Sequence, residues 1–152
     1  MALTHGRNLY FAVSTPSAGA MAAISAYTTE VSGLPGEQDL GDITVGGNVG
    51  YSYYPGLQKA SFTSVHTMDT ATTAAWEKFK SFQSLQQTYP NPSTSWGIQY
   101  APAGTTAGYP MITLNALIKS IAFSAKTTDP NIFSVSWDMN AGTTGVTVGI
   151  CS

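Results

Sequence analysis

His66 and the acidic residues between positions 30 and 42 are the side chains in this 152-residue sequence that could do acid–base or metal chemistry. Catalysis by acids, bases or nucleophiles needs His, carboxylate, Ser or Cys side chains that converge on one point. His66 shares an expected strand face with a serine, so half of a Ser–His pair is conceivable. A half-buried histidine satisfied by a neighbour is the favoured interpretation. No G-x-S-x-G or H-E-x-x-H motif occurs, and the sequence predicts no enzyme and no catalytic residue.

The other candidate sites for metals or cofactors are equally weak. Glu37, Asp39 and Asp42 form the densest carboxylate group, but they lack the ligand series and central glycine of an EF-hand loop. The single cysteine, Cys151, excludes a Cys-rich zinc site and an internal disulfide. The glycines at 46–50 are not followed by the Lys-Ser/Thr of a phosphate-binding loop and are typical of a hairpin tip. We therefore expect no metal and no cofactor.

The composition is that of a folded, weakly charged chain. Hydrophobic residues make up 43% and charged residues 9%, with a net charge of −2, whereas an ordinary soluble domain carries roughly 25% charge. Hydroxyls fill the deficit, with 20 Thr and 16 Ser. The six basic residues are scattered, which excludes nucleic-acid binding through a basic patch. No membrane partner is expected, since nothing approaches the ~20 consecutive apolar residues of a membrane span. The length favours one domain over residues 1–152.

Apolar periodicity predicts a mainly β fold, an antiparallel β-sandwich or barrel of about eight strands with one flanking α-helix over residues 72–87. The expected strands are 8–13, two strands within 43–57, 59–68, 95–101, 110–119, 121–126, 132–137 and 146–151. The helix carries apolar residues every three positions, which predicts a face packed on the sheet. The residues of that face are Trp76, Phe79, Phe82 and Leu85.

A long uncharged stretch runs from Ser81 to Ile118. Monomeric proteins usually place charges on strand edges to prevent pairing with neighbours. Two interpretations remain open: hydroxyls and amides solvate these loops, or the surface is covered in an assembly, whose centre is depleted of charge. Within this stretch Trp96 is expected to be exposed, whereas Trp76 and Trp137 lie on apolar faces.

A series of short motifs runs from Ile24 to Asp69. In chain order they are Ile-Ser-Ala-Tyr at 24–27, Val-Ser-Gly-Leu-Pro-Gly-Glu at 31–37, Asp-Ile-Thr at 42–44, Gly-Gly at 46–47, Tyr-Pro-Gly-Leu at 54–57, Ala-Ser-Phe at 60–62 and Asp69. This series resembles the major tail (tail tube) proteins of long-tailed bacteriophages, with a looser echo over 121–149. The sequence departs from the family pattern at Val45, where a second Thr is usual, and at Gly46-Gly47, where a Phe-Gly-like pair is usual.

The resemblance implies a structural virion protein that assembles into stacked, usually hexameric rings, which form a hollow tube through which DNA passes. It implies contacts with other copies and with other tail proteins, synthesis in the host bacterial cytoplasm and a place in the virion tail. A long hairpin at 42–57 would line the lumen or reach a neighbouring subunit, with candidate residues Asp42, Thr44, Gly46, Gly47, Asn48 and Tyr51. Glu37 and Asp39 are candidate acidic lumen residues, since a lumen that passes DNA should not hold phosphates.

Two other functions remain open from the sequence. The chain could be another virion assembly protein, such as a capsid decoration or filament subunit. It could also be a small module that binds sugar or peptide through Trp96 and the tyrosines at 89, 100 and 109.

Overall fold

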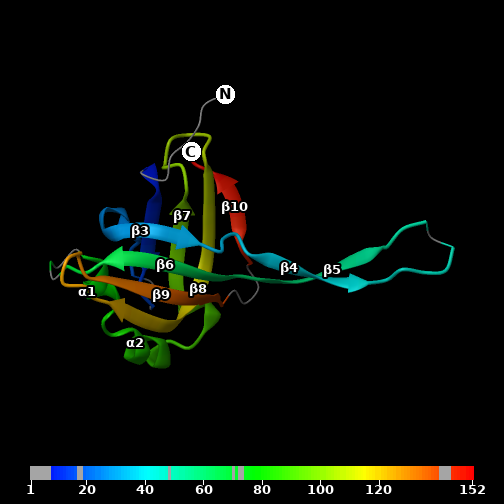
Figure 1. Cartoon of the computed structure of the whole chain (residues 1–152). Coiled ribbons are helices and arrows are strands. Elements are labelled where there is room, and N and C mark those ends of the chain that lie inside the picture. The colour runs from blue at the N-terminus through cyan, green and yellow to red at the C-terminus, as the bar shows by residue number, and fades with distance from the viewer. Residues whose placement is uncertain (1–7, 17–18, 48, 70, 72–73, 141–144) are drawn as a thin grey trace.

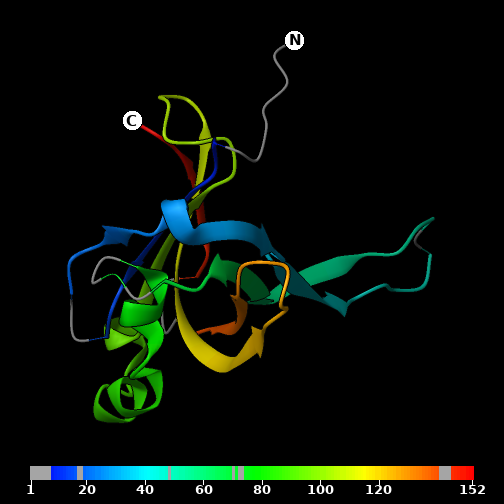
Figure 2. The ribbon, with the colours of Figure 1, turned by 60° about the vertical axis from the view of Figure 1, so that its left-hand side comes forward.

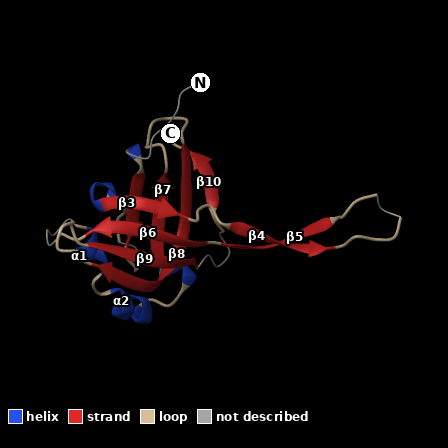
Figure 3. Cartoon of the chain, in the orientation of Figure 1, coloured by secondary structure: helices blue, strands red, loops and turns tan. Residues whose placement is uncertain are grey.

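The computed structural model describes residues 8–16, 19–47, 49–69, 71, 74–140 and 145–152, and its regular structure is mostly β (Figures 1 and 3). The strands are β1 Tyr10–Ser14, β2 Ala22–Ala23, β3 Thr28–Ser32, β4 Glu37–Asp42, β5 Tyr53–Lys59, β6 Ser61–Thr67, β7 Trp96–Ala101, β8 Pro110–Ser124, β9 Ile132–Met139 and β10 Thr147–Ile150. The α-helices are α1 Ala75–Phe79 and α2 Phe82–Thr88, and short 3-10 turns occur at Ser25–Tyr27 and Pro92–Thr94. The expected mainly β, antiparallel fold with a flanking helical segment is confirmed.

In the part of the chain that the structure describes, eight strands form one antiparallel sheet in the order β2-β1-β7-β8-β9-β6-β3, and β10 also pairs with β8. Strand β8 is the element shared by both halves of the sheet. Residues 112–116 pair with β7, and residues 116–124 pair with β9 with a register shift between Ile118 and Ser120. The sheet therefore bends along β8, so that β3, β6 and β9 cross over β1, β7 and β8 (Figures 1 and 2). The sequence predicted two strands, 110–119 and 121–126, where one strand with a bulge is found.

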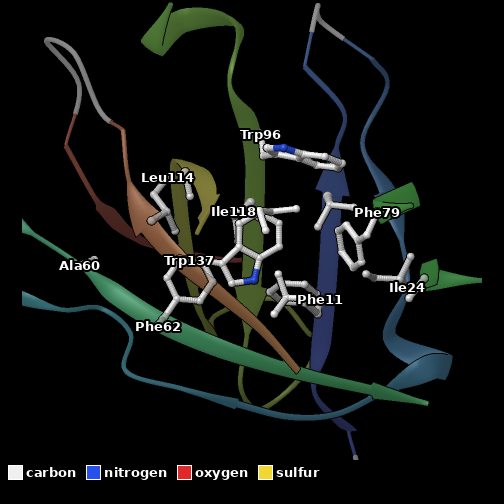
Figure 4. Packing of buried hydrophobic residues seen from close by; sticks show 14 of the residues in the cluster. Phe11, Ile24, Ala60, Phe62, Phe79, Trp96, Leu114, Ile118 and Trp137 are labelled. Carbon is white, nitrogen blue, oxygen red and sulfur yellow. The ribbon is translucent and has the colours of Figure 1, made fainter. Parts of the chain in front are cut away.

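The core lies between the two halves of the sheet and is rich in aromatic residues (Figure 4). Alternate residues of β9 face inward, and Phe133, Val135 and Trp137 are all buried. Trp137 stacks on Phe62 of β6 at 5.7 Å between ring centroids. Phe11 of β1 lies 5.7 Å from the ring of His66 of β6, which joins the two halves. The period-two pattern of apolar residues thus produces two inner faces that pack on each other.

The helical segment is divided in two at Lys80 and Ser81. Its buried residue Phe79 contacts the rings of Trp96 and Trp137 at 5.5 and 5.6 Å. The other members of the expected face pack at the margin of the core and are partly buried: Trp76, Phe82 and Leu85. Residues 72 and 73, at the start of the expected helix, lie outside the described residues.

Gln86 of α2 fixes this segment to β8. Its side-chain oxygen accepts hydrogen bonds from the backbone N–H of Ile118 (2.7 Å) and from Nε1 of Trp96 (3.1 Å). Its side-chain nitrogen donates to the carbonyl of Ile118 (3.1 Å). Strand β7 pairs with β8 only as far as Ala116, so the amide of Gln86 takes the place of a further strand residue at the edge of β8.

The expectation that Trp96 is exposed is wrong, because its side chain is completely buried. Its position among Ser and Gly residues suggested exposure within the strand expected at 95–101, but its ring, on the first residue of β7, lies between Phe79 and Trp137. The nitrogen of its indole ring is satisfied by Gln86. Burial of an indole is therefore compatible with polar neighbours in the sequence when a distant amide supplies the acceptor.

Candidate assembly surface

Strands β4 and β5 form a separate two-stranded ribbon, which projects from the body of the protein (Figure 1). We call residues 37–59 the arm. Every residue of both strands is exposed. The strands pair from Glu37 opposite Lys59 to Asp42 opposite Tyr53, with a register shift between Gln38 and Leu40. The arm is longer than the hairpin expected at 42–57, because it begins at position 37 and its strands end before the loop at 43–52.

Most of the large hydrophobic side chains that are exposed among the described residues lie on the arm. They are Leu40, Ile43, Val45, Val49, Tyr51, Tyr53, Tyr54 and Leu57. If an aromatic side chain supplies roughly 200 Å² and an aliphatic one roughly 100 Å², the exposed fractions add up to on the order of 700 Å². One partner of a stable protein interface contributes about 800 Å². So much exposed apolar area on one projecting element favours an interaction site.

The register of the strands assigns these side chains to two faces, because residues directly opposite each other point the same way and neighbours alternate. One face, which we call the Leu40 face, holds the pairs Leu40–Pro55 and Asp42–Tyr53. Tyr51 belongs to it as well, since its ring stacks on that of Tyr53 at 6.4 Å.

The opposite face, which we call the Tyr54 face, holds the pair Gly41–Tyr54. Ile43 follows by alternation, and its backbone N–H donates to the carbonyl of Ser52 (2.9 Å). Tyr54 and Ile43 are 66% and 55% exposed. Both faces of the ribbon thus present large apolar side chains to solvent.

Three of the four charged side chains of the arm lie at its root, and the fourth is Asp42 on the Leu40 face. Lys59 lies 3.3 Å from a carboxylate oxygen of Glu37 and 3.3 Å from one of Asp39. The hydrogen bonds to Asp39 and then to Glu37 raise the pKa of the Lys59 ammonium. The two candidate acidic lumen residues are therefore paired with a cation of the same arm.

Two glycines allow the arm to leave the body closely packed. Gly36 has a φ of +94°, and a Cβ there would lie 2.5 Å from the carbonyl oxygen of Lys59. Gly33 has a φ of +99°, and a Cβ there would lie 2.7 Å from the carbonyl of Ser61. Positive φ and close backbone approach both require glycine. The two glycines therefore let the segment 33–36, which leads into β4, pack directly on the backbone where β5 ends and β6 begins.

The remaining hairpin candidates lie near the tip of the arm. Asp42 accepts a hydrogen bond from the backbone N–H of Thr44 (2.8 Å), and its hydrogen bonds to Thr44 lower the pKa of its carboxyl. Gly47 has a φ of +92°, and at both Gly46 and Gly47 an added Cβ would meet nothing within 4 Å. Asn48 lies outside the described residues. Gly47 thus supplies the positive φ of the turn, and no contact within the subunit requires glycine at either position.

The free edge of β10 lies near the root of the arm. The side chain of Gln58 accepts a hydrogen bond from the backbone N–H of Val146 (3.2 Å), just before β10 begins. Val148 and Ile150 of β10 are 59% and 73% exposed, and residues 143–152 carry no charged side chain. An uncharged, apolar edge strand is a template for pairing with another chain.

The Ser–His pair considered from the sequence is formed by Ser64 and His66, and both side chains are buried in the core. Nε2 of His66 lies 2.8 Å from Oγ of Ser64 and Nδ1 lies 3.0 Å from Oγ1 of Thr28. Thr28 donates to the carbonyl of Ile24, so its oxygen accepts from Nδ1–H of His66. Nε2 then accepts from Ser64, whose oxygen accepts from Nε1 of Trp137 (2.9 Å). Sequence reasoning missed Thr28 and Trp137, because they come from other strands.

This chain of hydrogen bonds has a structural role. Ser64 and His66 are both completely buried, so no substrate reaches them. Burial lowers the pKa of the His66 imidazole to about 3, and the ring is neutral near pH 7. The interpretation of His66 as a histidine satisfied by its neighbours is confirmed, but the expected half-burial is wrong, because the side chain is completely buried.

The other candidate sites of the sequence find little support among the described residues. No group of three or more His, Cys, Asp or Glu side chains converges there, and none of the helices described is long and apolar enough to cross a membrane. The proposed platform for sugar or peptide loses its central residue, since Trp96 is buried. The arm is therefore the strongest candidate for function.

Solved structures similar to this fold include chains from a particle tail and from a tail tube. A chain from the tail of the empty GTA particle, refined with C6 symmetry, matches with a TM-score of 0.64 and 13% identity over 99% of this chain and 100% of that one. A chain from the SPP1 tail tube matches with a TM-score of 0.65 and 12% identity over 97% and 80%. The chain has the fold of tail tube proteins.

The same tail-tube fold extends to contractile injection systems. A chain from the extended sheath–tube complex of the PVC system matches with a TM-score of 0.60 and 20% identity over 92% of this chain and 88% of that one. Neither a protein-family model nor a curated protein sequence matches the chain. The likeness is thus one of fold, at low sequence identity.

Proposed function

We propose that this chain is a structural virion protein that assembles into stacked hexameric rings and so forms the hollow tail tube through which phage DNA passes. The observation that carries the proposal is the exposed apolar arm on a tail-tube fold. A monomer has no use for on the order of 700 Å² of apolar side chains held away from its core. A subunit of an assembly can bury these side chains against its neighbours.

Ring formation is supported by the sheet edges and by the structural neighbours. The edge of β10 is uncharged and apolar, and a head-to-tail contact between unlike edges forms a ring when the rotation between subunits closes. The similar GTA tail was refined with C6 symmetry, which favours six subunits a ring. The other partners in this proposal are further tail proteins, and the protein resides in the virion tail after synthesis in the host bacterial cytoplasm.

DNA passage is supported by the charge of the chain. The net charge is −2, and no Lys or Arg occurs between Arg7 and Lys59. Lys59 is itself paired with Glu37 and Asp39. A wall without free cations would not retain phosphates. We propose that Asp42, Thr44 and Tyr51 face either this lumen or a neighbouring subunit.

Negative-stain electron microscopy of the concentrated protein tests the proposal. We expect hollow, striated tubes. Compact trimers would instead indicate a capsid decoration protein, and solid fibres a filament subunit. A Gly47→Val variant should assemble less well, because its φ of +92° strains any residue with a Cβ. Gly46→Val, at a position without positive φ, is the matched control.

A further inference from the structure

We propose that a buried chain of hydrogen bonds holds the edge strand β3 in a single register on β6, and so sets the place from which the arm leaves the body. The chain joins side chains of three strands to one backbone carbonyl, in the order Trp137 of β9, Ser64 and His66 of β6, Thr28 of β3 and the carbonyl of Ile24. The inference is independent of the proposed function, because it concerns the folded subunit and not its polymer.

The two ends of the chain fix the direction of every bond in it. The indole N–H of Trp137 can only donate, and the carbonyl oxygen of Ile24 can only accept. The hydroxyl oxygen of Thr28 lies 2.9 Å from that carbonyl oxygen, and two oxygens this close need a hydrogen between them. Because the Thr28 hydrogen is used there, the His66 imidazole donates from Nδ1 and accepts at Nε2. The imidazole is therefore held in one tautomer by groups on all three strands.

The chain lies in an apolar part of the core. Its four side chains are buried, and those of Ser64 and His66 are completely buried. Three phenylalanine rings lie 5.3 to 5.7 Å from the imidazole, measured between ring centroids: Phe11, Phe79 and Phe133. A polar atom of the chain that lost its partner would be left unpaired among these rings, which is unfavourable.

The register of β3 depends on this chain because little else in the strand defines it. Of its five residues only Thr28, directly opposite His66, is buried, and only Val31 is half-buried. Register is weakly specified where a strand has few side chains to bury. A slip by two residues, the smallest that keeps each side chain on its face, would bring Ala26 or Glu30 opposite His66. Neither has a hydroxyl that can accept from Nδ1–H and donate onward.

The register of β3 in turn positions the arm. The strand ends at Ser32, and residues 33–36 lead from it into β4. Gly33 and Gly36 pack on the backbone at Ser61 and Lys59. A slip by two residues would shift this segment by about 7 Å along β6 and break both contacts. Thr28 thus holds one end of β3, and the two glycines hold the other.

Nuclear magnetic resonance and amide hydrogen exchange of the full chain test the inference. The sequence has two histidines, so a His5→Gln background labelled with ¹⁵N-histidine reports on His66 alone. Thr28→Val removes the hydroxyl at nearly constant shape, and Thr28→Ser keeps it. Thr29→Val is the matched control, because its hydroxyl donates to the carbonyl of Val65 (3.2 Å) and is not part of the chain.

The first readout is the tautomer of His66, and the second is the exchange rate of the β3 amides, which measures how often the strand leaves its register. We expect Nδ1–H in the wild type, Thr28→Ser and Thr29→Val, and Nε2–H in Thr28→Val. Exchange in β3 should be roughly tenfold faster in Thr28→Val and within twofold of the wild type in the other two. Should Thr28→Val fail to fold, Thr28→Ala makes the same comparison.

Three results would overturn the inference. The first is a wild-type His66 that carries its proton on Nε2, since the chain would then run in the opposite direction. The second is a Thr28→Val variant whose β3 exchanges as slowly as in the wild type. The third is a Thr29→Val variant that speeds exchange in β3 as much as Thr28→Val does, because any lost hydroxyl would then have the same effect.

Discussion

Replacing Gln86 with alanine should destabilise the protein far more than its place on a short surface helix suggests. The side chain makes three hydrogen bonds, two of which it accepts from the N–H of Ile118 and the Nε1–H of Trp96. Trp96 is completely buried and Ile118 is 3% exposed. A buried donor left without a partner costs about 1–3 kcal/mol. Two such donors predict a loss of about 2–6 kcal/mol in the free energy of unfolding.

The assay is thermal and urea unfolding of the wild type and three variants. For a chain of this size, 1 kcal/mol shifts the melting temperature by about 2–4 °C, so Gln86→Ala should melt roughly 5–15 °C lower. Gln86→Glu keeps both accepted bonds but places a carboxylate oxygen against the carbonyl oxygen of Ile118, where the amide nitrogen donates, so it should also lose stability. Gln87→Ala, at the exposed neighbouring position, is the control. A Gln86→Ala variant within 1 kcal/mol of the wild type would refute the view that this amide replaces a strand at the edge of β8.

Three further outcomes are expected. His66 is neutral in the folded state down to pH about 3 but takes up a proton near pH 6.5 when unfolded, so stability should fall as the pH drops below 6.5, by about 2 kcal/mol at pH 5. Urea unfolding at pH 7.5 and 5 measures this, and a His66→Gln variant that lost as much stability would contradict it. Gly36→Val should lower the melting temperature by more than 5 °C, because both its φ and the carbonyl of Lys59 oppose a side chain, whereas Gly41→Ala, with no atom closer than 3.8 Å, should not. Lys59→Gln should leave the melting temperature unchanged, because exposed ion pairs contribute little; a large shift would show that the root of the arm is held electrostatically.

The sequence was most informative where one physical signal dominates. Strand β9 was predicted because Phe133, Val135 and Trp137 alternate with polar residues, and one inner face of the sheet requires that period. The helical segment was predicted from its apolar spacing, although its division at Lys80 and Ser81 was not. Residue types also predicted that His66 would be satisfied by neighbours.

The failures involve partners that are distant in sequence. Trp96 looked exposed because its neighbours are polar, and only the fold brings Gln86 and Phe79 to it. Strand β8 looked like two strands, because a bulge near Lys119 interrupts the alternation without ending the pairing with β9. The length of the arm was missed, since β4 and β5 are exposed on both faces and have no inside–outside pattern to read.

Strand β8 also has a mechanical consequence. Its 15 residues are continuous through both halves of the sheet, with β7 and β10 bonded to one part and β9 to the other. A force that slides one half of the sheet past the other is therefore carried by the covalent backbone of β8. To separate the two halves, it would have to break the backbone hydrogen bonds that join β8 to its neighbouring strands. In the tube proposed above, we expect force along the polymer to separate neighbouring copies before it opens the sheet of a subunit.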